Sequence, residues 1–293
     1  MRIRVKDVAA LAVFVLAAPW LAPGTLDSQT PAGTGFPTYK APRTADGRPN
    51  LNGIWQSFTT ANWDVLAHVA QPGPHPELMG AWGAGPGGQS IVEGNEIPYQ
   101  PWAAAKKEEN FKNRMVVKVT NDPRRFDTGE PELQCYRPGV PRANYMPYPF
   151  QIFQTPTQIL IVYEFKGAIR TIYMNSKDEA PSDTWMGWSK GRWEGDTLVV
   201  DVTAFESYTW FDRAGNFHSD ALHVVERYTP VSPYHIQYEA TIEDPKVFTR
   251  PWKMSFPLYR RVEPNVQLIE FNCVPFVQEM MYAPLGLYKP RSK

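Results

Sequence analysis

The chain has 293 residues, of which 43% are hydrophobic, and its 30 basic and 30 acidic residues cancel to a formal net charge of zero. This length and apolar content suffice for one large core or two modest ones, and the lack of a basic patch argues against a nucleic-acid partner or an anionic-membrane partner. No G-x-G-x-x-G, P-loop or H-E-x-x-H motif occurs, which argues against dinucleotide, nucleoside-triphosphate and standard zinc-protease chemistry.

The first 24 residues are typical of an export signal. Arg2, Arg4 and Lys6 form a positive end, and residues 8–22 form an apolar run that is short for a bilayer span and ends in Pro and Gly. The alternative is an uncleaved N-terminal anchor. We expect the mature protein to be periplasmic or secreted, with no stable membrane insertion after the signal is removed. Residues 25–50, rich in Pro, Thr and Gly, are predicted to form an extended or disordered linker.

Residues 51–293 are predicted to form a single β-rich domain that begins with an N-terminal wrap and helix, residues 51–147. Residues 51–58 are predicted as a strand and 62–70 as a short helix capped by Asn62. The Gly- and Pro-rich residues 71–101 are expected to form an ordered wrap, a mobile lid or a linker. Residues 101–114, with Pro at the start and Ala, Lys and Glu throughout, are predicted as a helix.

From residue 148 onward the hydrophobic period changes to two. Stretches rich in Ile, Val, Tyr, Phe and Thr alternate with short turns and contain no intervening helix. We therefore expect a mainly β fold, an antiparallel meander over 148–275 that either closes as a lipocalin-like barrel or packs as a sandwich, with one or two short N-terminal helices outside it. Residues 276–293 are expected to form a C-terminal tail. The predicted strands lie within 151–165, 168–174, 191–202, 222–230, 235–244, 252–261 and 268–274.

A G-x-S-x-G pattern occurs at Gly187–Gly191, with Ser189 at its centre. In hydrolases this pattern forms a nucleophile elbow, which requires a strand that turns sharply into a helix. Here Ser189 is followed by a strand, a Glu194-Gly195-Asp196 turn and a second strand, which is a hairpin signal. We therefore predict that Ser189 is no nucleophile and that the glycines serve strand packing or a bulge.

Cys135 and Cys273 are the two cysteines of the chain. An oxidising compartment favours a disulfide between them, and closing so long a loop stabilises by about 4–5 kcal/mol in the chain-entropy model. The alternative is two buried free thiols.

The richest polar cluster spans residues 212–228, and its candidate catalytic residues are His218, Asp220, His223 and Glu226. On an extended segment His218 and Asp220 share one face, where a carboxylate beside an imidazole supports general acid–base chemistry. No cofactor is predicted, although the same pair is able to ligate a metal if a third ligand comes from elsewhere. The alternative is structural: His218 and Asp220 cap a loop, and Glu226, sharing a face with apolar residues, forms a buried ion pair. The possible partners of Glu226 are Arg170, Arg192 and Arg250.

Aromatic residues surround this cluster in the sequence. Tyr173, Trp185, Trp188 and Trp210 are the candidate ligand-binding residues, because aromatic walls with a few polar groups suit a sugar ring or a flat apolar molecule. The alternative is ordinary barrel packing.

The chain resembles an abundant family of exported bacterial β-rich proteins that has no assigned function. The resemblance covers most of residues 42–275, and the run GRWEGDTLVVD is specific, as are FHSDALHVVERY and IEDPKVFTRPW. Residues 115–132 are longer than the corresponding stretch of such proteins. The family implies export and a β-rich fold but supplies no catalytic residues. The stretches that carry the resemblance are residues 45–55, 91–110, 135–156, 191–205, 217–228 and 238–253.

Two functions follow from these observations. The first is an exported enzyme of lyase, isomerase or hydrolase type that uses side-chain acid–base chemistry on a small sugar-like or hydrophobic molecule. The second is a non-catalytic, lipocalin-like small-molecule binding protein whose barrel mouth is covered by residues 71–101. In both cases the partner is a small molecule, and the oligomeric state is left open.

Overall fold

The computed structural model describes residues 39–73, 76, 83–114 and 129–274. The contacts divide the chain after Pro37, and every described residue belongs to the second of the two units. The expected signal peptide (1–24) and the expected C-terminal tail (276–293) lie outside the described residues, as do parts of the 25–50 and 71–101 segments. Within the described ranges, no helix has the length and apolar character needed to cross a membrane.

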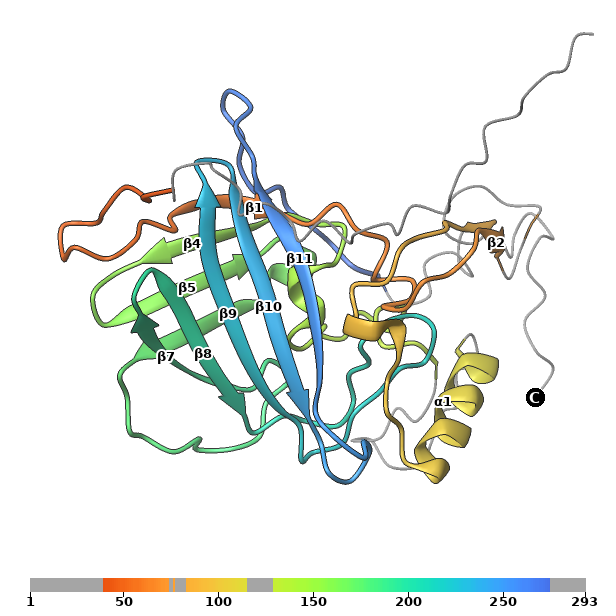
Figure 1. Cartoon of the computed structure of the whole chain (residues 1–293). Coiled ribbons are helices and arrows are strands. Elements are labelled where there is room, and N and C mark those ends of the chain that lie inside the picture. Colours follow the sequence, from red (N-terminus) through yellow and green to blue (C-terminus); the bar gives the residue numbers. More distant parts are fainter. Residues whose placement is uncertain (1–38, 74–75, 77–82, 115–128, 275–293) are drawn as a thin grey trace, which may run out of the picture. The chain divides into compact units, whose positions relative to one another are not determined.

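Nine strands form a closed barrel, which confirms the mainly β fold and decides for a barrel over a sandwich (Figure 1). Eight of the strands are neighbours in chain order, and the N-terminal strand β1 closes the barrel between the last strand and β4. The strands are β1 Gly53–Gln56, β4 Phe150–Gln154, β5 Gln158–Tyr163, β6 Ile169–Met174, β7 Trp188–Glu194, β8 Thr197–Thr203, β9 His223–Ser232, β10 His235–Glu243 and β11 Trp252–Arg260.

The period of two decides which side chains enter the barrel. In β10, Ile236, Tyr238, Ala240 and Ile242 are buried, and the residues between them are partly or fully exposed. β9 follows the same rule and places one charged residue, Glu226, on its buried face. Because successive side chains of a strand point to opposite faces, the alternation in the sequence is enough to form an apolar interior.

The pair β6–β7 is parallel, so the expectation of a purely antiparallel meander is wrong at this one seam. Ile172 lies opposite Ser189, and residues 175–187 connect the two strands without a helix. A Cβ at Gly191 would lie only 2.7 Å from Cγ2 of Ile172 and 2.7 Å from Sδ of Met174. The missing side chain of Gly191 therefore allows β6 and β7 to approach.

The helix predicted at 101–114 is confirmed as α1, Pro101–Asn113, which lies outside the barrel (Figure 1, yellow). Its buried residues are Ala103 and Asn110, and Asn110 Nδ2 donates to the carbonyl oxygen of Gly215 at 3.2 Å. The other short elements are β2 Gln71–Pro72, β3 Ala84–Gly85, and the 3₁₀ turns η2 Glu93–Asn95, η3 Arg142–Asn144 and η4 Phe165–Gly167.

Two predicted elements do not form. Residues 62–70 form a turn, bends and an isolated bridge between His68 and Gly88 rather than a helix. Asn62 does not act as a helix cap, since its side chain binds Glu132 and Arg142, far away in the sequence. Residues 268–274 form no strand. The backbone N–H of Ile269 in this stretch donates to a side-chain oxygen of Glu164 at 3.0 Å instead of to a neighbouring strand.

Residues 39–50, the described end of the expected linker, fold into a turn. Arg43 and Pro49 form an isolated antiparallel bridge, and Ala41 is buried. An ion pair of 2.8 Å between Arg43 and Asp196 connects this turn to the β7–β8 hairpin.

Candidate functional site

Ser189 lies in the middle of β7 and is buried. Its Oγ accepts a hydrogen bond from Nε of Arg170 at 2.8 Å, and the strand continues into the β7–β8 hairpin rather than into a helix. Gly187 has a φ of +69°, and a Cβ there would lie 2.7 Å from Val202. The G-x-S-x-G pattern therefore serves strand packing, as predicted, and forms no nucleophile elbow.

Glu226 is fully buried inside the barrel, where it pairs with Arg170, one of the three partners that the sequence predicted. Oε1 of Glu226 accepts hydrogen bonds from Asn144 Nδ2 (3.0 Å), Tyr228 OH (3.0 Å) and Tyr238 OH (2.8 Å). Tyr163 joins the network by donating to Asn144 Oδ1 at 3.0 Å, and burial raises the pKa of Tyr163 to about 12.

These side chains occupy the barrel interior at the level of Glu226. Each polar atom of the network has a partner, and the members are almost completely shielded from solvent. A buried and satisfied network of this kind fixes one packing arrangement. The geometry therefore favours a structural role for Glu226, and its catalytic role stays a prediction.

The structure does not bring His218 and Asp220 together on one face. His218 is buried: its Nδ1 donates to the carbonyl oxygen of Ser219 (2.8 Å), and its Nε2 accepts from Thr209 Oγ1 (2.6 Å). Burial also lowers the pKa of His218. Asp220 is exposed and forms an ion pair of 2.6 Å with Lys246. The expected shared face is absent because the segment is a loop rather than a strand.

His223 lies on the outer face of β9, opposite in direction to Glu226 as the alternation predicted. Its two ring nitrogens lie 3.2 Å from Asp201 and 3.3 Å from Glu243, on the two neighbouring strands. Among the residues that the structure describes, no group of three or more His, Cys, Asp or Glu side chains is arranged to hold a metal ion.

The four predicted aromatic residues do not form one wall. Tyr173 stacks on Trp188 with ring centroids 4.5 Å apart, whereas Trp185 packs against Tyr136 at 4.7 Å. Trp210 packs against the core. None of the four lines the pocket described below.

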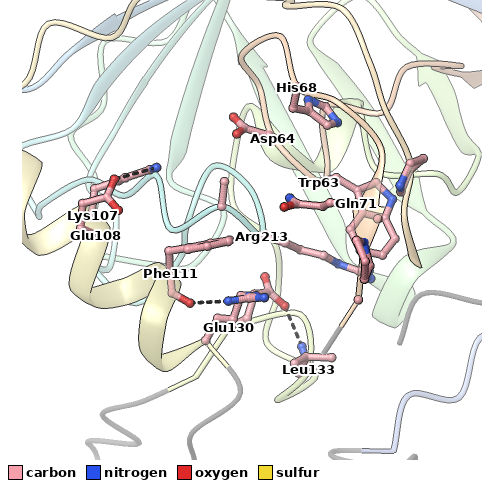
Figure 2. A pocket seen from close by; sticks show the side chains of 16 residues that line it. Trp63, Asp64, His68, Gln71, Lys107, Glu108, Phe111, Glu130, Leu133 and Arg213 are labelled. Atoms are coloured by element: carbon pink, nitrogen blue, oxygen red, sulfur yellow. Dashed lines mark hydrogen bonds and ion pairs between the residues drawn. The ribbon is translucent and has the colours of Figure 1, made fainter. Parts of the chain in front are cut away.

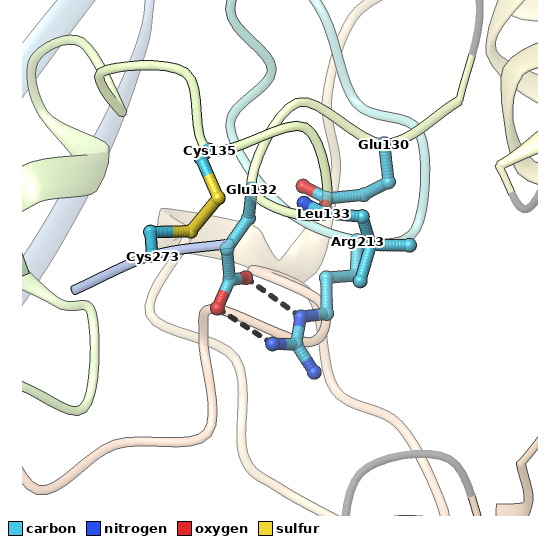
Figure 3. The surroundings of a disulfide bond; sticks show 6 residues. All are labelled: Glu130, Glu132, Leu133, Cys135, Arg213 and Cys273. Atoms are coloured by element: carbon cyan, nitrogen blue, oxygen red, sulfur yellow. Dashed lines mark hydrogen bonds and ion pairs between the residues drawn. A yellow bond between two sulfur atoms is a disulfide. The ribbon is translucent and has the colours of Figure 1, made fainter. Parts of the chain in front are cut away.

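Cys135 and Cys273 form a disulfide, as predicted, with their Cα atoms 5.7 Å apart. The bond joins the segment after Glu132 to the chain that follows the barrel (Figure 3). A disulfide is compatible with an oxidising compartment.

A pocket of about 220 Å³ lies outside the barrel, beside α1. Lys107, Glu108 and Phe111 of α1 form one side, Trp63 and Gln71 lie opposite, and Asp64 and His68 close one end (Figure 2). Glu130, Leu133 and Arg213 line the rest, together with Arg114, Ala214 and the segments 72–73 and 85–86.

Buried ion pairs hold the pocket-lining residues Glu130 and Arg213 in place. Glu132 binds Arg213 through two hydrogen bonds (2.7 and 2.6 Å; Figure 3) and Arg142 at 3.1 Å, and Arg142 also pairs with Glu130 at 2.6 Å. Burial would raise the pKa of Glu132, but the two guanidinium groups outweigh it and lower the pKa to about 2. The two guanidinium groups therefore hold Glu132 in its ionised form, whereas burial raises the pKa of Glu130.

One carboxyl group lies in the pocket wall and a second lies behind it. Asp64 lines the pocket, and the fully buried Asp212 is connected to it through Asn216, whose Nδ2 lies 2.6 Å from Asp212 Oδ2 and 3.5 Å from Asp64 Oδ1. Asp212 also accepts hydrogen bonds from the backbone N–H groups of Val65 (2.9 Å) and Ala214 (2.9 Å). Tyr99 completes the group by donating to Asn216 Oδ1 at 2.9 Å.

Both carboxyl groups bind protons more tightly than usual. Burial and then the negative charge of Asp64 raise the pKa of Asp212 to about 7, and burial also raises the pKa of Asp64. Two interacting acids lose their protons in two steps that belong to the pair. The pair therefore holds a proton near neutral pH, which is what a group that exchanges protons with a substrate requires.

Sequence reasoning found only part of this site. Asp212 and Arg213 belong to the polar cluster at 212–228, but Asp64 and His68 lie in the segment predicted as a helix. Asp212 binds the backbone of Val65, 147 positions away. No local pattern marks such a contact, because it depends on how the loops fold over the end of the barrel.

No protein-family model, curated protein or solved structure matches the chain. The resemblance to an exported β-rich family therefore stays a prediction, and the function has to be argued from the geometry of the site.

Proposed function

We propose that this protein is an exported acid–base enzyme that acts on a small molecule in the pocket beside α1. Asp64 exchanges protons with the substrate, and Asp212 acts as a positioning residue that sets the proton affinity of Asp64. One observation carries the proposal: the half-buried carboxyl group of Asp64 and the fully buried one of Asp212 share the side-chain amide of Asn216 at the wall of a pocket, and the pKa of Asp212 is raised to about 7.

Several features of the pocket support this role. Trp63 and Phe111 offer apolar surface to a substrate, and Asp64 offers a polar group at one end. Lyase, isomerase and hydrolase reactions on small molecules all need a proton to move to or from the substrate. A general acid or base works best when its pKa lies near the working pH; the pKa of Asp64 is raised from its ordinary value, and the pKa of its neighbour Asp212 is raised to about 7.

Export to the periplasm or to the medium is part of the proposal. It rests on the signal-like residues 1–24, and the Cys135–Cys273 disulfide is compatible with it. Mass analysis of the mature protein tests it, because a protein that keeps residues 1–24 contradicts cleavage of a signal peptide.

A non-catalytic binding protein is the second candidate. The closed barrel is compatible with it, but the interior at the level of Glu226 is occupied by side chains. A ligand would therefore sit in the same pocket beside α1, without chemical change.

Incubation with a bacterial small-molecule extract separates the two candidates. Purified mature protein is mixed with the extract, and mass spectrometry compares the compounds before and after incubation. We expect at least one compound to be converted by the wild type and by Asp183→Asn, an exposed control, but not by Asp64→Asn. A compound that is retained but never converted supports the binding protein, and no retention or conversion contradicts both candidates.

A further inference from the structure

The acidic side chains around the pocket differ in whether a cation compensates them. Glu108 pairs with Lys107 at 3.2 Å, Glu130 with Arg142 at 2.6 Å and Glu132 with Arg213 at 2.6 Å. Within the described residues, no Lys, Arg or His nitrogen lies within 4.0 Å of a carboxylate oxygen of Asp64 or Asp212. Asp64 and Asp212 therefore differ from the other acids around the pocket, because neither has an ion-pair partner among the described residues.

The hydrogen bonds of these two acids come from neutral groups. Asp212 is satisfied by backbone N–H groups and by Asn216. Oδ1 of Asp64 accepts from the N–H of Leu66 (2.9 Å) and lies near Asn216, while Oδ2 receives no hydrogen bond from the described residues. Asp64 therefore keeps a free acceptor at the pocket wall. Asp212 is fully buried and Asp64 is half-buried, so a positively charged ligand at Asp64 offsets part of the cost of placing two uncompensated carboxyl groups there.

The walls of the pocket contain two aromatic rings, and a guanidinium group covers one face of each. Arg213 lies over the Trp63 ring at 4.3 Å, and Arg114 lies over the Phe111 ring at 4.0 Å. Drug-sized pockets typically have about 300–1,000 Å³, so a pocket of about 220 Å³ suits a molecule with a single ring or a body of similar size.

We propose that the pocket selects a small organic cation, a primary or secondary ammonium on a compact apolar body, with the ammonium bound to Asp64 and the apolar body between Trp63 and Phe111. This inference rests on the proposed function, because it names the substrate class of the same site. An ammonium supplies the hydrogen-bond donors that Oδ2 of Asp64 accepts and the positive charge that the Asp64–Asp212 pair lacks.

Protons compete with such a ligand. The pair that holds one proton still has one negative charge, but the doubly ionised pair attracts an ammonium more strongly. Because the pKa of Asp212 is raised to about 7, the affinity for the cation should rise as the pH increases from 6 to 8. Neutral and anionic ligands should not show this rise.

Lys107 is the competing source of positive charge, since its ammonium lowers the pKa of Asp64 from a distance. If Lys107 leaves Glu108 and pairs with Asp64, it supplies the missing charge itself. The variant Lys107→Met distinguishes the two cases. Under the proposal the wild type binds the cation and the variant binds it at least as tightly, whereas cation binding by the variant alone contradicts the proposal.

The test uses three probes of nearly equal shape, benzylammonium, benzyl alcohol and benzoate, in calorimetric titrations of the mature protein at pH 6, 7 and 8. We expect benzylammonium to bind about tenfold more tightly than benzyl alcohol at pH 8, with an affinity that increases from pH 6 to 8. Asp64→Asn should remove this preference and Asp183→Asn should keep it, with circular dichroism confirming that both variants are folded.

The outcomes separate this inference from the proposed function. Equal binding of benzyl alcohol or tighter binding of benzoate overturns the cation class but leaves a ligand pocket in place. Absence of binding by all three probes also overturns it, while the extract experiment still decides the proposed function. If Asp64→Asn does not fold, the pH dependence of the wild type decides: a flat or falling affinity for benzylammonium between pH 6 and 8 contradicts the inference.

Discussion

Glu226 and Asp212 are both completely buried acids, but the fold stabilises them in different ways. Glu226 has a guanidinium partner, Arg170, in addition to its hydrogen bonds from neutral groups. Asp212 has hydrogen bonds from neutral groups alone among the described residues. An ion pair keeps a buried carboxylate charged, whereas burial without a cation favours its protonated form. This difference is why we assign Glu226 to the fold and Asp212 to the candidate site.

The first prediction concerns the ion pair in the barrel. Glu226→Gln should lower the free energy of unfolding by about 3–5 kcal/mol, because it leaves the buried Arg170 guanidinium without its counter-charge. Glu239→Gln, an exposed position on the neighbouring strand β10, is the matched control and should have little effect. Urea unfolding measures both. A loss below about 1 kcal/mol for Glu226→Gln would mean that the ion pair does not hold the barrel interior together.

For single residues, the sequence predicts contacts of side chains on strands, because strand alternation fixes which face each side chain points to. It does not predict contacts between irregular loops. Strand alternation places Glu226 among apolar residues, so a buried cationic partner was predictable, and Arg170 was among the three possibilities. The connection of Asp64 to Asp212 through Asn216 depends on two irregular segments, in which a side chain binds a backbone N–H group, as Asp212 binds that of Val65. Irregular segments have no period from which such a contact can be predicted.

For the strands, the turn residues of the sequence correctly predicted the β7–β8 hairpin. The Glu194-Gly195-Asp196 turn joins β7 to β8, as predicted, and Gly195 has the positive φ of +59° that such a turn requires. The parallel pairing of β6 and β7 was not predictable, because parallel neighbours are usually recognised by a helical crossover. Here residues 175–187 make the crossover without a helix.

The second prediction tests the parallel seam. Gly191→Ala should lower the free energy of unfolding by about 1–3 kcal/mol, because the added methyl group meets Ile172 and Met174 at 2.7 Å inside a closed sheet. Gly85→Ala is the control, since a Cβ there has only ordinary contacts of 3.6 Å or more. If the two variants unfold at the same denaturant concentration, β6 and β7 are not as closely packed as the structure describes.

For the whole molecule, the Cys135–Cys273 disulfide links two parts of the chain that are far apart in the sequence. It joins residues 138 positions apart and connects the segment that carries Glu130 and Glu132 to the chain after β11. The sequence allowed the pairing to be predicted from the even cysteine count and the expected export alone. It did not indicate that the bond lies next to the ion pairs under the pocket (Figure 3).

The third prediction follows from this position. Replacing both cysteines, Cys135→Ser with Cys273→Ser, should lower the free energy of unfolding by about 4–5 kcal/mol in the chain-entropy model, because the unfolded chain gains the freedom of a long open loop. Chemical denaturation of the double variant measures this loss. Intact mass with and without reductant is the control and should differ by two hydrogens in the wild type; two thiols that react with an alkylating reagent in unreduced native protein would contradict the bond.

The proposed acid–base chemistry requires that Asp64 and Asp212 together hold a proton near neutral pH. Titration of the aspartate side-chain carboxyl carbons by ¹³C NMR tests this claim directly. We predict one carboxyl signal with an apparent pKa of about 7 in the wild type. In Asp64→Asn this value should fall, because the negative charge of Asp64 no longer raises the pKa of Asp212. If every aspartate of the wild type titrates near its ordinary value of about 4, the pair holds no proton at neutral pH and the proposed acid–base site is wrong.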